Sequence, residues 1–207
     1  ITEVVSHYRG KVVHWDVVNE VLDDNAKLRE SVWSPLGEQY IADAFRWAHE
    51  ADPDAKLYLN DYNIEGINSK SNAYYELVQR LLADGVPIHG IGLQTHVTNG
   101  TYPSRMRENI QRFADLGLEV AITEADVRIE MPADEADLQT QADTYRKTLE
   151  ACLAVPKCVS YTVWGFTDRH SWVPGTFSNM GAATLMTEDL TPKPAYEAVR
   201  ATLETGR

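Results

Sequence analysis

The amino-acid sequence predicts an α/β fold built on a parallel sheet. A strand-like segment followed by a helix-like segment occurs five times in succession, an order that builds parallel sheets with right-handed crossovers. The strand-like segments are short and nearly continuously apolar, as expected of strands buried on both faces. Each segment ends in polar or aromatic residues, and α/β folds place their chemistry at the carboxyl ends of such strands.

The predicted elements run along the whole chain without an internal linker. Strands are predicted at residues 12–19, 57–63, 88–96, 119–127 and 158–166. Helices are predicted at residues 1–10, from 41 to the residue before Pro53, from 69 (with Ser69 as the cap) to 85, at 103–117 and at 192–205. A further long predicted helix follows a loop through Pro132, carries Ala142 and ends near Pro156. Residues 23–38 and 167–191 are predicted loops. Five units fit an open doubly wound sheet or part of a barrel, since a complete eight-stranded barrel normally needs about 250 residues.

Composition narrows the classes of function. The 207 residues suffice for one domain, and the net charge of −12 disfavours nucleic acid or an anionic membrane as a partner. No apolar run reaches membrane-spanning length. No glycine-rich phosphate loop follows any strand, so we expect no nucleotide, and no other cofactor is indicated.

Two cysteines, Cys152 and Cys158, lie six residues apart at the end of a predicted helix and the start of a strand. No histidine accompanies them in zinc-ligand spacing, so we expect no metal site. They could be two buried thiols or a disulfide, and a disulfide would indicate an oxidising compartment.

Two predicted strands end in a glutamate, Glu20 and Glu124. Taken alone, each could be a solvated acid at a strand end. Two such acids are the minimum set for retaining glycoside hydrolysis, in which one protonates the leaving oxygen and the other attacks the anomeric carbon. A parallel barrel would bring both strand ends to one mouth.

The remaining strand ends carry the groups that a sugar site needs. Amides and acids bind hydroxyl groups, and aromatic rings pack on the apolar face of a pyranose. Any one of these residues could be structural, but their occurrence at five successive strand ends favours a common site. The residues are Asn19, Glu20, Asn60, Asp61, Tyr62, Asn63, Gln94, His96, Glu124, Asp126 and Trp164.

These motifs resemble those of glycoside hydrolase family 10, the retaining endo-β-1,4-xylanases. The resemblance covers the whole chain, in the stretches WDVVNE (15–20), LNDYN (59–63), GLQTH (92–96), ITEADV (122–127), WGFTD (164–168) and SW (171–172). It implies a (β/α)8 TIM barrel, with residues 1–207 as the C-terminal part of one catalytic barrel, covering strands 4 to 8. Ala125 stands where the family more usually has leucine.

The resemblance also implies residue roles. Glu20 would be the general acid/base and Glu124 the nucleophile, with His96 orienting Glu124 and Asp126 fixing the imidazole. The nucleophile must stay ionised, whereas the acid must be protonated at rest and become a base after glycosylation. The residues expected to contact substrate are Asn19 at the 2-hydroxyl, Gln94 near subsite −1, Tyr62 near +1, Trp164 as the floor of −1, Trp172 as a wall above it, and Asn60 and His96.

Further expectations follow from the same resemblance. The family often joins two cysteines near Cys152 and Cys158, which favours the disulfide and a secreted, extracellular enzyme. The substrates would be xylan and xylo-oligosaccharides. Three N-terminal βα units of the family barrel have no counterpart here, so we expect them to be supplied in the same or another chain.

Three alternatives remain at this point. The chain could be a β-1,4-glucanase of the same clan, because room for a C6 hydroxymethyl group decides between the two substrates. It could be a polysaccharide-binding or inhibitor-like relative, although both acids are present. It could also be a fragment that is inactive without its N-terminal segment.

Overall fold

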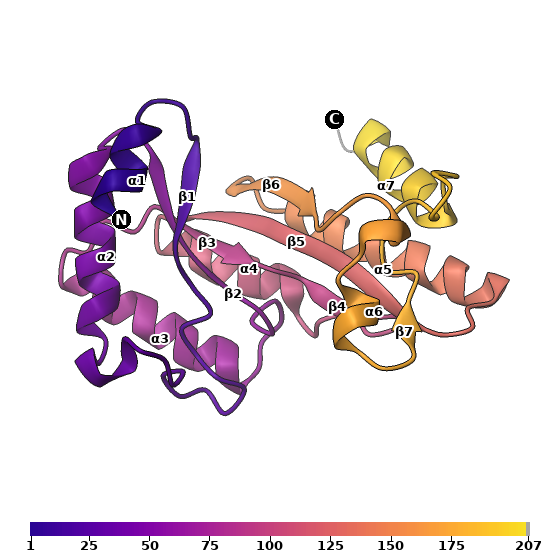
Figure 1. The fold of residues 1–207 in the computed structure, drawn as a ribbon, viewed down its shortest axis with the longest axis horizontal. Coiled ribbons are helices and arrows are strands. Elements are labelled where there is room, and N and C mark those ends of the chain that lie inside the picture. The colour runs from indigo at the N-terminus through magenta and orange to yellow at the C-terminus, as the bar shows by residue number, and fades with distance from the viewer. Residues whose placement is uncertain (206–207) are drawn as a thin grey trace.

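Five parallel strands form the main sheet of the computed structural model, which describes residues 1–205 (Figure 1). They lie side by side in chain order: β1 (His14–Asn19), β2 (Lys56–Asp61), β3 (Gly90–Leu93), β5 (Glu119–Glu130) and β6 (Cys158–Val163). A doubly wound sheet reverses its strand order at a switch point. The sequential order seen here is that of a singly wound barrel, which confirms the α/β class and excludes the doubly wound alternative.

Helices alternate with the strands and cover the sheet. They are α1 (Thr2–His7), α2 (Gln39–Ala51), α3 (Ser69–Ala83), α4 (Met106–Asp115), α5 (Glu135–Leu153), α6 (Val173–Thr176) and α7 (Pro194–Thr205), with 3-10 turns η1 (Ser34–Leu36) and η2 (Asp168–His170). Each longer helix between strands turns an apolar stripe toward the sheet, because its apolar residues recur every three or four positions. Phe45, Leu77 and Phe113 join Leu59 and Ile122 of the strands in one buried cluster.

Four local predictions need correction. The strand predicted at 88–96 is interrupted, because Thr95 takes a left-handed φ of 66°. The chain resumes as β4 (His96–Thr98), which pairs with a more distant part of β5. The cap of α3 is Asn68 and not Ser69, since the Asn68 side chain accepts a hydrogen bond from Ser71 N–H at 2.8 Å.

The other two corrections concern the carboxyl side of the site. The strand predicted at 119–127 continues to Glu130. The predicted loop 167–191 contains η2, the short helix α6 and β7 (Met180–Gly181), and β7 pairs antiparallel with the end of β5. A strand of two residues has no periodicity of its own. Its pairing with the last residues of β5 extends β5 beyond the predicted end.

The two outer strands of the main sheet leave apolar side chains exposed. Within residues 1–205, β1 pairs only with β2, and β6 pairs only with β5. Val13, next to β1, is 82% exposed, and Val159 on β6 is 54% exposed. Strands in the middle of a closed parallel sheet are buried on both faces. The outer sides of β1 and β6 therefore expose apolar side chains, whereas the middle strands of the same sheet bury theirs.

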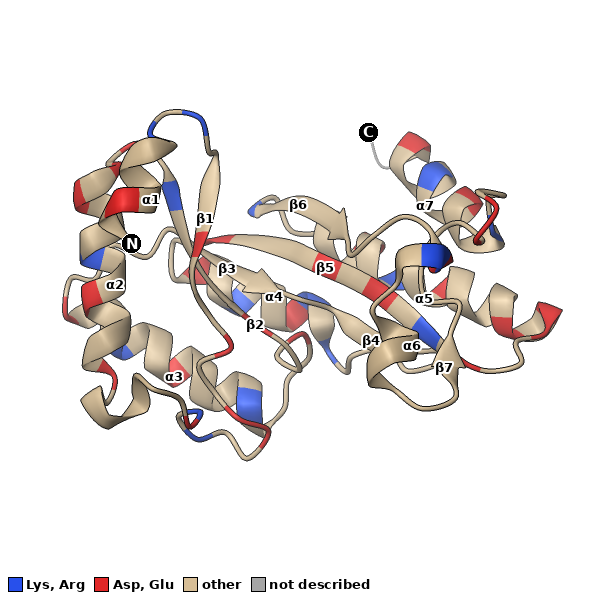
Figure 2. Ribbon diagram, viewed as in Figure 1, with Lys and Arg blue, Asp and Glu red and all other residues tan. Residues whose placement is uncertain are grey.

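Cys152 and Cys158 form a disulfide that joins the end of α5 to the start of β6. The pairing implied by the family resemblance is thus confirmed. Figure 2 shows the acidic residues distributed over α1, α2, α5 and α7 rather than gathered in one patch. None of the helices in the described part of the chain is long and apolar enough to cross a membrane.

Candidate active site

The carboxyl ends of the strands surround a cavity of about 580 Å³. Its walls hold most of the residues predicted from the sequence: Asn19, Glu20, Tyr62, Gln94, His96, Glu124, Trp164 and Trp172. Asn60 and Asp126 are fully buried behind this wall and act on it through hydrogen bonds. Parallel strands thus bring together residues that are up to 153 positions apart in the sequence (172 − 19).

The site begins where each strand leaves the sheet. Glu20, Asn63 and Thr95 follow β1, β2 and β3, and all three have left-handed φ angles between 55° and 66°. Side chains other than glycine rarely adopt this region, and it is found where a backbone must turn sharply. At Glu20 the turn is held by a hydrogen bond from its N–H to Asn60 O at 2.9 Å. The turn directs the Glu20 side chain into the cavity rather than along the strand.

Glu124 is held through both carboxyl oxygens. Asn60 Nδ2 donates to Oε1 at 2.9 Å, and His96 Nε2 lies 3.2 Å from Oε2. The backbone N–H of Glu124 donates to Gln94 O at 3.1 Å, which fixes its position relative to β3. Contacts to both oxygens fix the orientation of this carboxyl group.

His96 lies between two carboxylates. Its Nε2 faces Glu124, and its Nδ1 lies 3.0 Å from Asp126 Oδ2. Burial of His96 would lower its pKa, but the bonds to Asp126 and Glu124 outweigh burial and raise the pKa to about 9. The ring is therefore an imidazolium at neutral pH. Trp172 Nε1–H donates to the same Asp126 oxygen at 2.7 Å, so the indole and the imidazole share one anchor.

Glu20 is held by one amide and one cation. Gln94 Nε2 donates to Glu20 Oε1 at 3.2 Å, and Arg29 lies 3.3 Å from Oε2. Arg29 also donates to Tyr62 Oη at 2.8 Å. The loop after β1 returns Arg29 to Glu20, because Arg29 N–H bonds to Val21 O. Sequence reasoning missed Arg29, since nothing in a polar loop marks where that loop returns.

Asn60 connects the two halves of the site. Its Nδ2 donates to Asn19 Oδ1 at 3.0 Å as well as to Glu124, and its Oδ1 accepts from Thr123 Oγ1 at 2.8 Å. Asn60 is 1% exposed. A side chain at Gly92 would overlap the Asn60 amide, so the absent Cβ leaves the space that this amide fills. The motif GLQTH thus contributes a gap as well as polar groups.

Tyr62 rests on a buried ion pair. Lys70 Nζ lies 3.4 Å from the centre of the Tyr62 ring and donates to Asp61 Oδ1 at 2.8 Å. Asp61 also accepts from the N–H groups of Leu22 and Tyr62. Burial raises the pKa of Asp61, opposed by its bonds to Lys70 and to these N–H groups. The pair fixes the ring at the cavity wall by a cation–π contact.

Two aromatic residues border the cavity on the side of β6. Trp164 is 47% exposed, and Trp172 packs edge-on against His96 and Phe177. The segment that carries Trp172 is fixed by Asp168, which accepts hydrogen bonds from Lys193 and Thr184. The exposed indole of Trp164, in the same cavity as two carboxyl groups, can pack against a ligand ring that has an apolar face.

In the part of the chain that the structure describes, no group of three or more His, Cys, Asp or Glu side chains has the geometry to hold a metal ion. The polar groups of the cavity instead bond to one another. They leave the cavity surface lined by carboxyl, amide and aromatic groups.

Comparison with known proteins identifies the family. The model of glycosyl hydrolase family 10 matches residues 1–202. An endo-1,4-beta-xylanase of Agaricus bisporus is 49% identical over 197 residues, which are 95% of this chain and 59% of that protein. Endo-1,4-beta-xylanase B of Thermotoga neapolitana is 46% identical, over 99% of this chain and 60% of its own length.

Solved structures agree with this assignment. Xylanase 10B of Thermotoga petrophila RKU-1, determined in complex with xylobiose, has a TM-score of 0.96 and 47% identity, and covers 98% of this chain and 63% of its own. A glycosylated endo-beta-1,4-xylanase of family 10 from Gloeophyllum trabeum has a TM-score of 0.93 at 40% identity. The chain spans about 60% of the length of these relatives and has the fold of part of their (β/α)8 barrel. The chain belongs to glycosyl hydrolase family 10.

Proposed function

We propose that this chain carries the catalytic residues for hydrolysis of internal β-1,4-xylosidic bonds in xylan, by a retaining double displacement. The observation that carries the proposal is the contrast between two glutamates in one cavity. Glu124 is 15% exposed and is held by the buried Asn60 amide and by His96. Glu20, at another strand end, is 34% exposed and is held by the Gln94 amide and by Arg29. Two carboxyl groups in different environments suit two different roles.

In the first step Glu124 attacks the anomeric carbon while Glu20 donates its proton to the departing glycosidic oxygen. The bonds from Asn60 and His96 hold the Glu124 carboxyl group in a fixed orientation at the cavity wall. Formation of the glycosyl ester removes the negative charge of Glu124. Glu20, now a carboxylate, then takes a proton from the water that hydrolyses the ester.

The other cavity residues would bind and place the sugars. Asn19 would bind the 2-hydroxyl at subsite −1, with Gln94 and His96 beside it, and Trp164 and Trp172 would border the same ring. Tyr62 would pack against the sugar at +1. Asn60 is buried, so we assign it to positioning Asn19 and Glu124 rather than to sugar contact.

Product release from xylohexaose tests the proposal, with the purified chain beside its Glu124→Ala variant. Turnover that disappears in the variant is the expected result, because no covalent intermediate can form. Unchanged turnover in the variant would exclude Glu124 as the nucleophile. If the chain turns over xylohexaose only after an N-terminal barrel segment of a relative is added, the cleft is shared between the two pieces.

We propose further that the open sides of β1 and β6 contact additional barrel segments, in the same or another chain. The exposed side chains of Val13 and Val159 and the greater length of the relatives support this. Hydrogen exchange of the β1 and β6 amides should slow when such a segment binds. Exchange that stays equally fast would count against contact at these strands.

We propose also that the protein is secreted. The Cys152–Cys158 disulfide supports this, because disulfides persist mainly in oxidising compartments. Fractionation of the producing cells, with free thiols labelled on lysis, should find the protein outside the cells with both cysteines blocked. Intracellular protein with two labelled thiols would contradict the proposal.

A further inference from the structure

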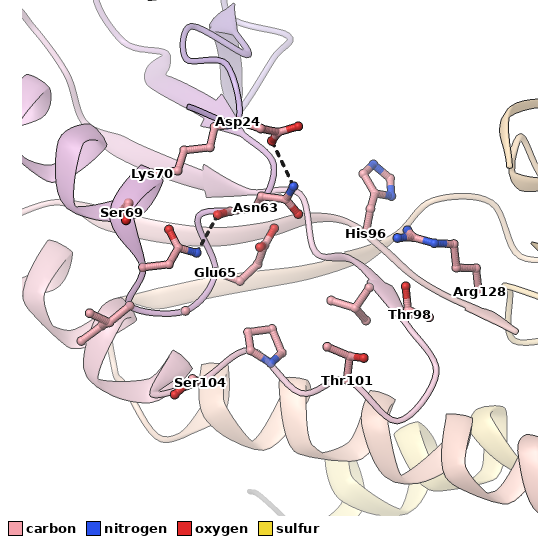
Figure 3. Close-up of a pocket in the computed structure, with 15 residues that line it drawn as sticks. Asp24, Asn63, Glu65, Ser69, Lys70, His96, Thr98, Thr101, Ser104 and Arg128 are labelled. Atoms are coloured by element: carbon pink, nitrogen blue, oxygen red, sulfur yellow. Dashed lines mark hydrogen bonds between the residues drawn. The ribbon is translucent and has the colours of Figure 1, made fainter. Parts of the chain in front are cut away.

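Glu65 is a buried acid that the proposed mechanism does not use. It lies in the loop between β2 and α3 and is 5% exposed. Figure 3 shows its side chain pointing away from Ser104 and Thr101. A buried carboxyl group needs a hydrogen-bond partner, and Glu65 Oε1 accepts the backbone N–H of Thr95 at 2.8 Å. The acid is therefore bonded to the turn that follows β3.

Thr95 is the residue at which the predicted strand breaks. Its φ is 66°, in the left-handed region that β-branched residues rarely adopt, and it is 1% exposed. Such a conformation persists where surrounding contacts impose it. Three hydrogen bonds do so here: Thr95 N–H to Glu65, the Thr95 hydroxyl to Leu93 O at 3.1 Å, and Asp126 N–H to Thr95 O at 3.3 Å. The bond to Glu65 is the shortest of the three, and its acceptor is a side chain.

The turn at Thr95 places the residues on either side of it against both proposed catalytic glutamates. Gln94 Nε2 donates to Glu20 Oε1 at 3.2 Å, and Gln94 O accepts the N–H of Glu124 at 3.1 Å. His96 Nε2 lies 3.2 Å from Glu124 Oε2. Because Gln94 and His96 flank one left-handed residue, a change of φ at Thr95 would move these contacts relative to each other.

The backbone that carries Glu65 is itself held by α4. Asn109, a fully buried residue of that helix, donates through Nδ2 to Ile64 O at 2.6 Å and to Glu65 O at 2.9 Å. Arg112 Nε donates to Asn109 Oδ1 at 2.8 Å, which fixes the orientation of the amide. A chain of hydrogen bonds thus runs from α4 through Glu65 to the turn at Thr95, so the acceptor of the turn sits on a fixed support.

We propose that Glu65 is a positioning residue for hydrolysis, which holds the Thr95 turn and through it the side chains that contact the two catalytic glutamates. This inference rests on the proposed function, since that function assigns the glutamates to the reaction. The role asks for a hydrogen-bond acceptor and not for a charge, because a protonated carboxyl group still accepts through its carbonyl oxygen. An amide of the same shape should therefore serve at this position, whereas an apolar side chain should not.

Three variants test the role by turnover of xylohexaose. Glu65→Met keeps the length of the side chain and removes its oxygens, and kcat should fall about tenfold to a hundredfold, because small displacements of catalytic groups have effects of this size. Glu65→Gln keeps an acceptor and should retain most of the turnover. Thr148→Val, which removes a buried hydroxyl group from α5, is the control for lost stability and should leave kcat unchanged.

The imidazole of His96 reports its own placement without any turnover. Burial lowers its pKa, but the bonds to Asp126 and Glu124 outweigh burial and raise the pKa to about 9. In Glu65→Met the ring should lie farther from these carboxylates, so its pKa, followed by NMR, should fall toward the ordinary value of 6.5. Glu65→Gln should keep the pKa near 9. A merely structural role of Glu65 would lower stability without moving this pKa.

A double variant keeps the test decisive if Glu65→Met alone does not fold. Thr95→Gly removes the steric cost of a left-handed φ, so adding it to Glu65→Met should restore part of the stability lost to denaturant. The His96 pKa of the double variant should lie below that of Thr95→Gly alone, because the acceptor that holds the turn is absent.

Three results would overturn the inference: a His96 pKa that Glu65→Met leaves unchanged, a loss of kcat as large in Glu65→Gln as in Glu65→Met, or a double variant no more stable than Glu65→Met. Failure of the proposed function looks different. Xylohexaose would then not be turned over by the unsubstituted chain, with or without an added barrel segment. The His96 pKa would still decide whether Glu65 places the ring.

Discussion

Asn60 Nδ2 lies 2.9 Å from Glu124 Oε1, and the amide that makes this bond occupies space left free by the glycine at position 92. The orientation of the proposed nucleophile, Glu124, therefore depends on Gly92, a residue without a side chain. A Cβ at this position would meet both the Asn60 amide and the Thr123 methyl group. Overpacking of this kind typically costs about 1–3 kcal/mol.

Gly92→Ala should lower the free energy of unfolding by this amount and should also reduce turnover, because Asn60 must move away from Glu124. Denaturant unfolding and xylohexaose turnover measure the two effects. Gly175→Ala is the matched control, since Gly175 has no atom within 4 Å of an added Cβ and no left-handed φ. Equal behaviour of the two variants would show that Asn60 tolerates the displacement.

Glu20→Ala should separate substrates by their leaving groups. Xylan needs protonation of its leaving oxygen, and general acid catalysis typically contributes about 10²–10⁴-fold. A xylobioside with an activated phenol needs little protonation, so its first step should be affected far less. The comparison of kcat/KM for both substrates tests this, with Glu30→Ala, an exposed acid, as the control. Equal losses on both substrates would argue against Glu20 as the acid.

His96 should make stability depend on pH. Its pKa is about 9 in the folded chain, against an ordinary value of 6.5. A raised folded-state pKa adds stability that is fully present below pH 6.5 and is lost as pH rises through 9. The difference corresponds to about 3 kcal/mol as an upper value for a side chain that is 11% exposed.

Unfolding free energies at pH 6 and pH 9.5 measure this contribution. The fall in stability should be larger for the wild type than for His96→Gln, in which the titrating ring is absent. His7→Gln, on the exposed face of α1, should retain the wild-type fall. Parallel curves for the wild type and His96→Gln would mean that the two carboxylates do not hold the imidazolium.

Lys70→Met should be strongly destabilising, because it leaves the Asp61 carboxylate buried without its cation. Removal of one partner from a buried pair typically costs about 3–5 kcal/mol. The double variant Lys70→Met, Asp61→Asn should recover part of the loss, since it removes the buried charge and its amide oxygen can still accept one of the two backbone N–H groups, of Leu22 and Tyr62, that bond to different oxygens of Asp61. A double-mutant cycle from denaturant unfolding gives the coupling energy, and purely additive losses would show that the two side chains act independently.

The sequence predicted the parts of this protein that follow from local pattern. Apolar runs located all five parallel strands, and strand ends identified Glu20 and Glu124 because a carboxyl group cannot be buried there without partners. Arg29 and Arg128 were not predicted as site residues, although Arg29 contacts Glu20 and Arg128 lines the catalytic cavity. Arg29 depends on how one loop returns, and Arg128 on a strand that extends beyond its predicted end.

The interruption of a strand and the cap of a helix were predicted less well than the strands, because both depend on contacts with distant parts of the chain. Asn68 and Ser69 are both good cap residues, and only the direction of the preceding chain decides between them. Thr95 takes a glycine-like conformation that no propensity of threonine suggests, because hydrogen bonds to Glu65 and within the turn hold it there. Tertiary contacts that impose a local conformation leave no local signal.

The left-handed φ of 57° at Glu20 sets stability and activity against each other at one position. A side chain in this region costs about 1–2 kcal/mol that glycine avoids. Glu20→Gly should therefore melt at a higher temperature than Glu20→Ala, although both lack the carboxyl group. Selection of variants for heat resistance alone would favour glycine at this position and discard the proposed acid, so a screen for thermostable forms must score hydrolysis alongside melting temperature.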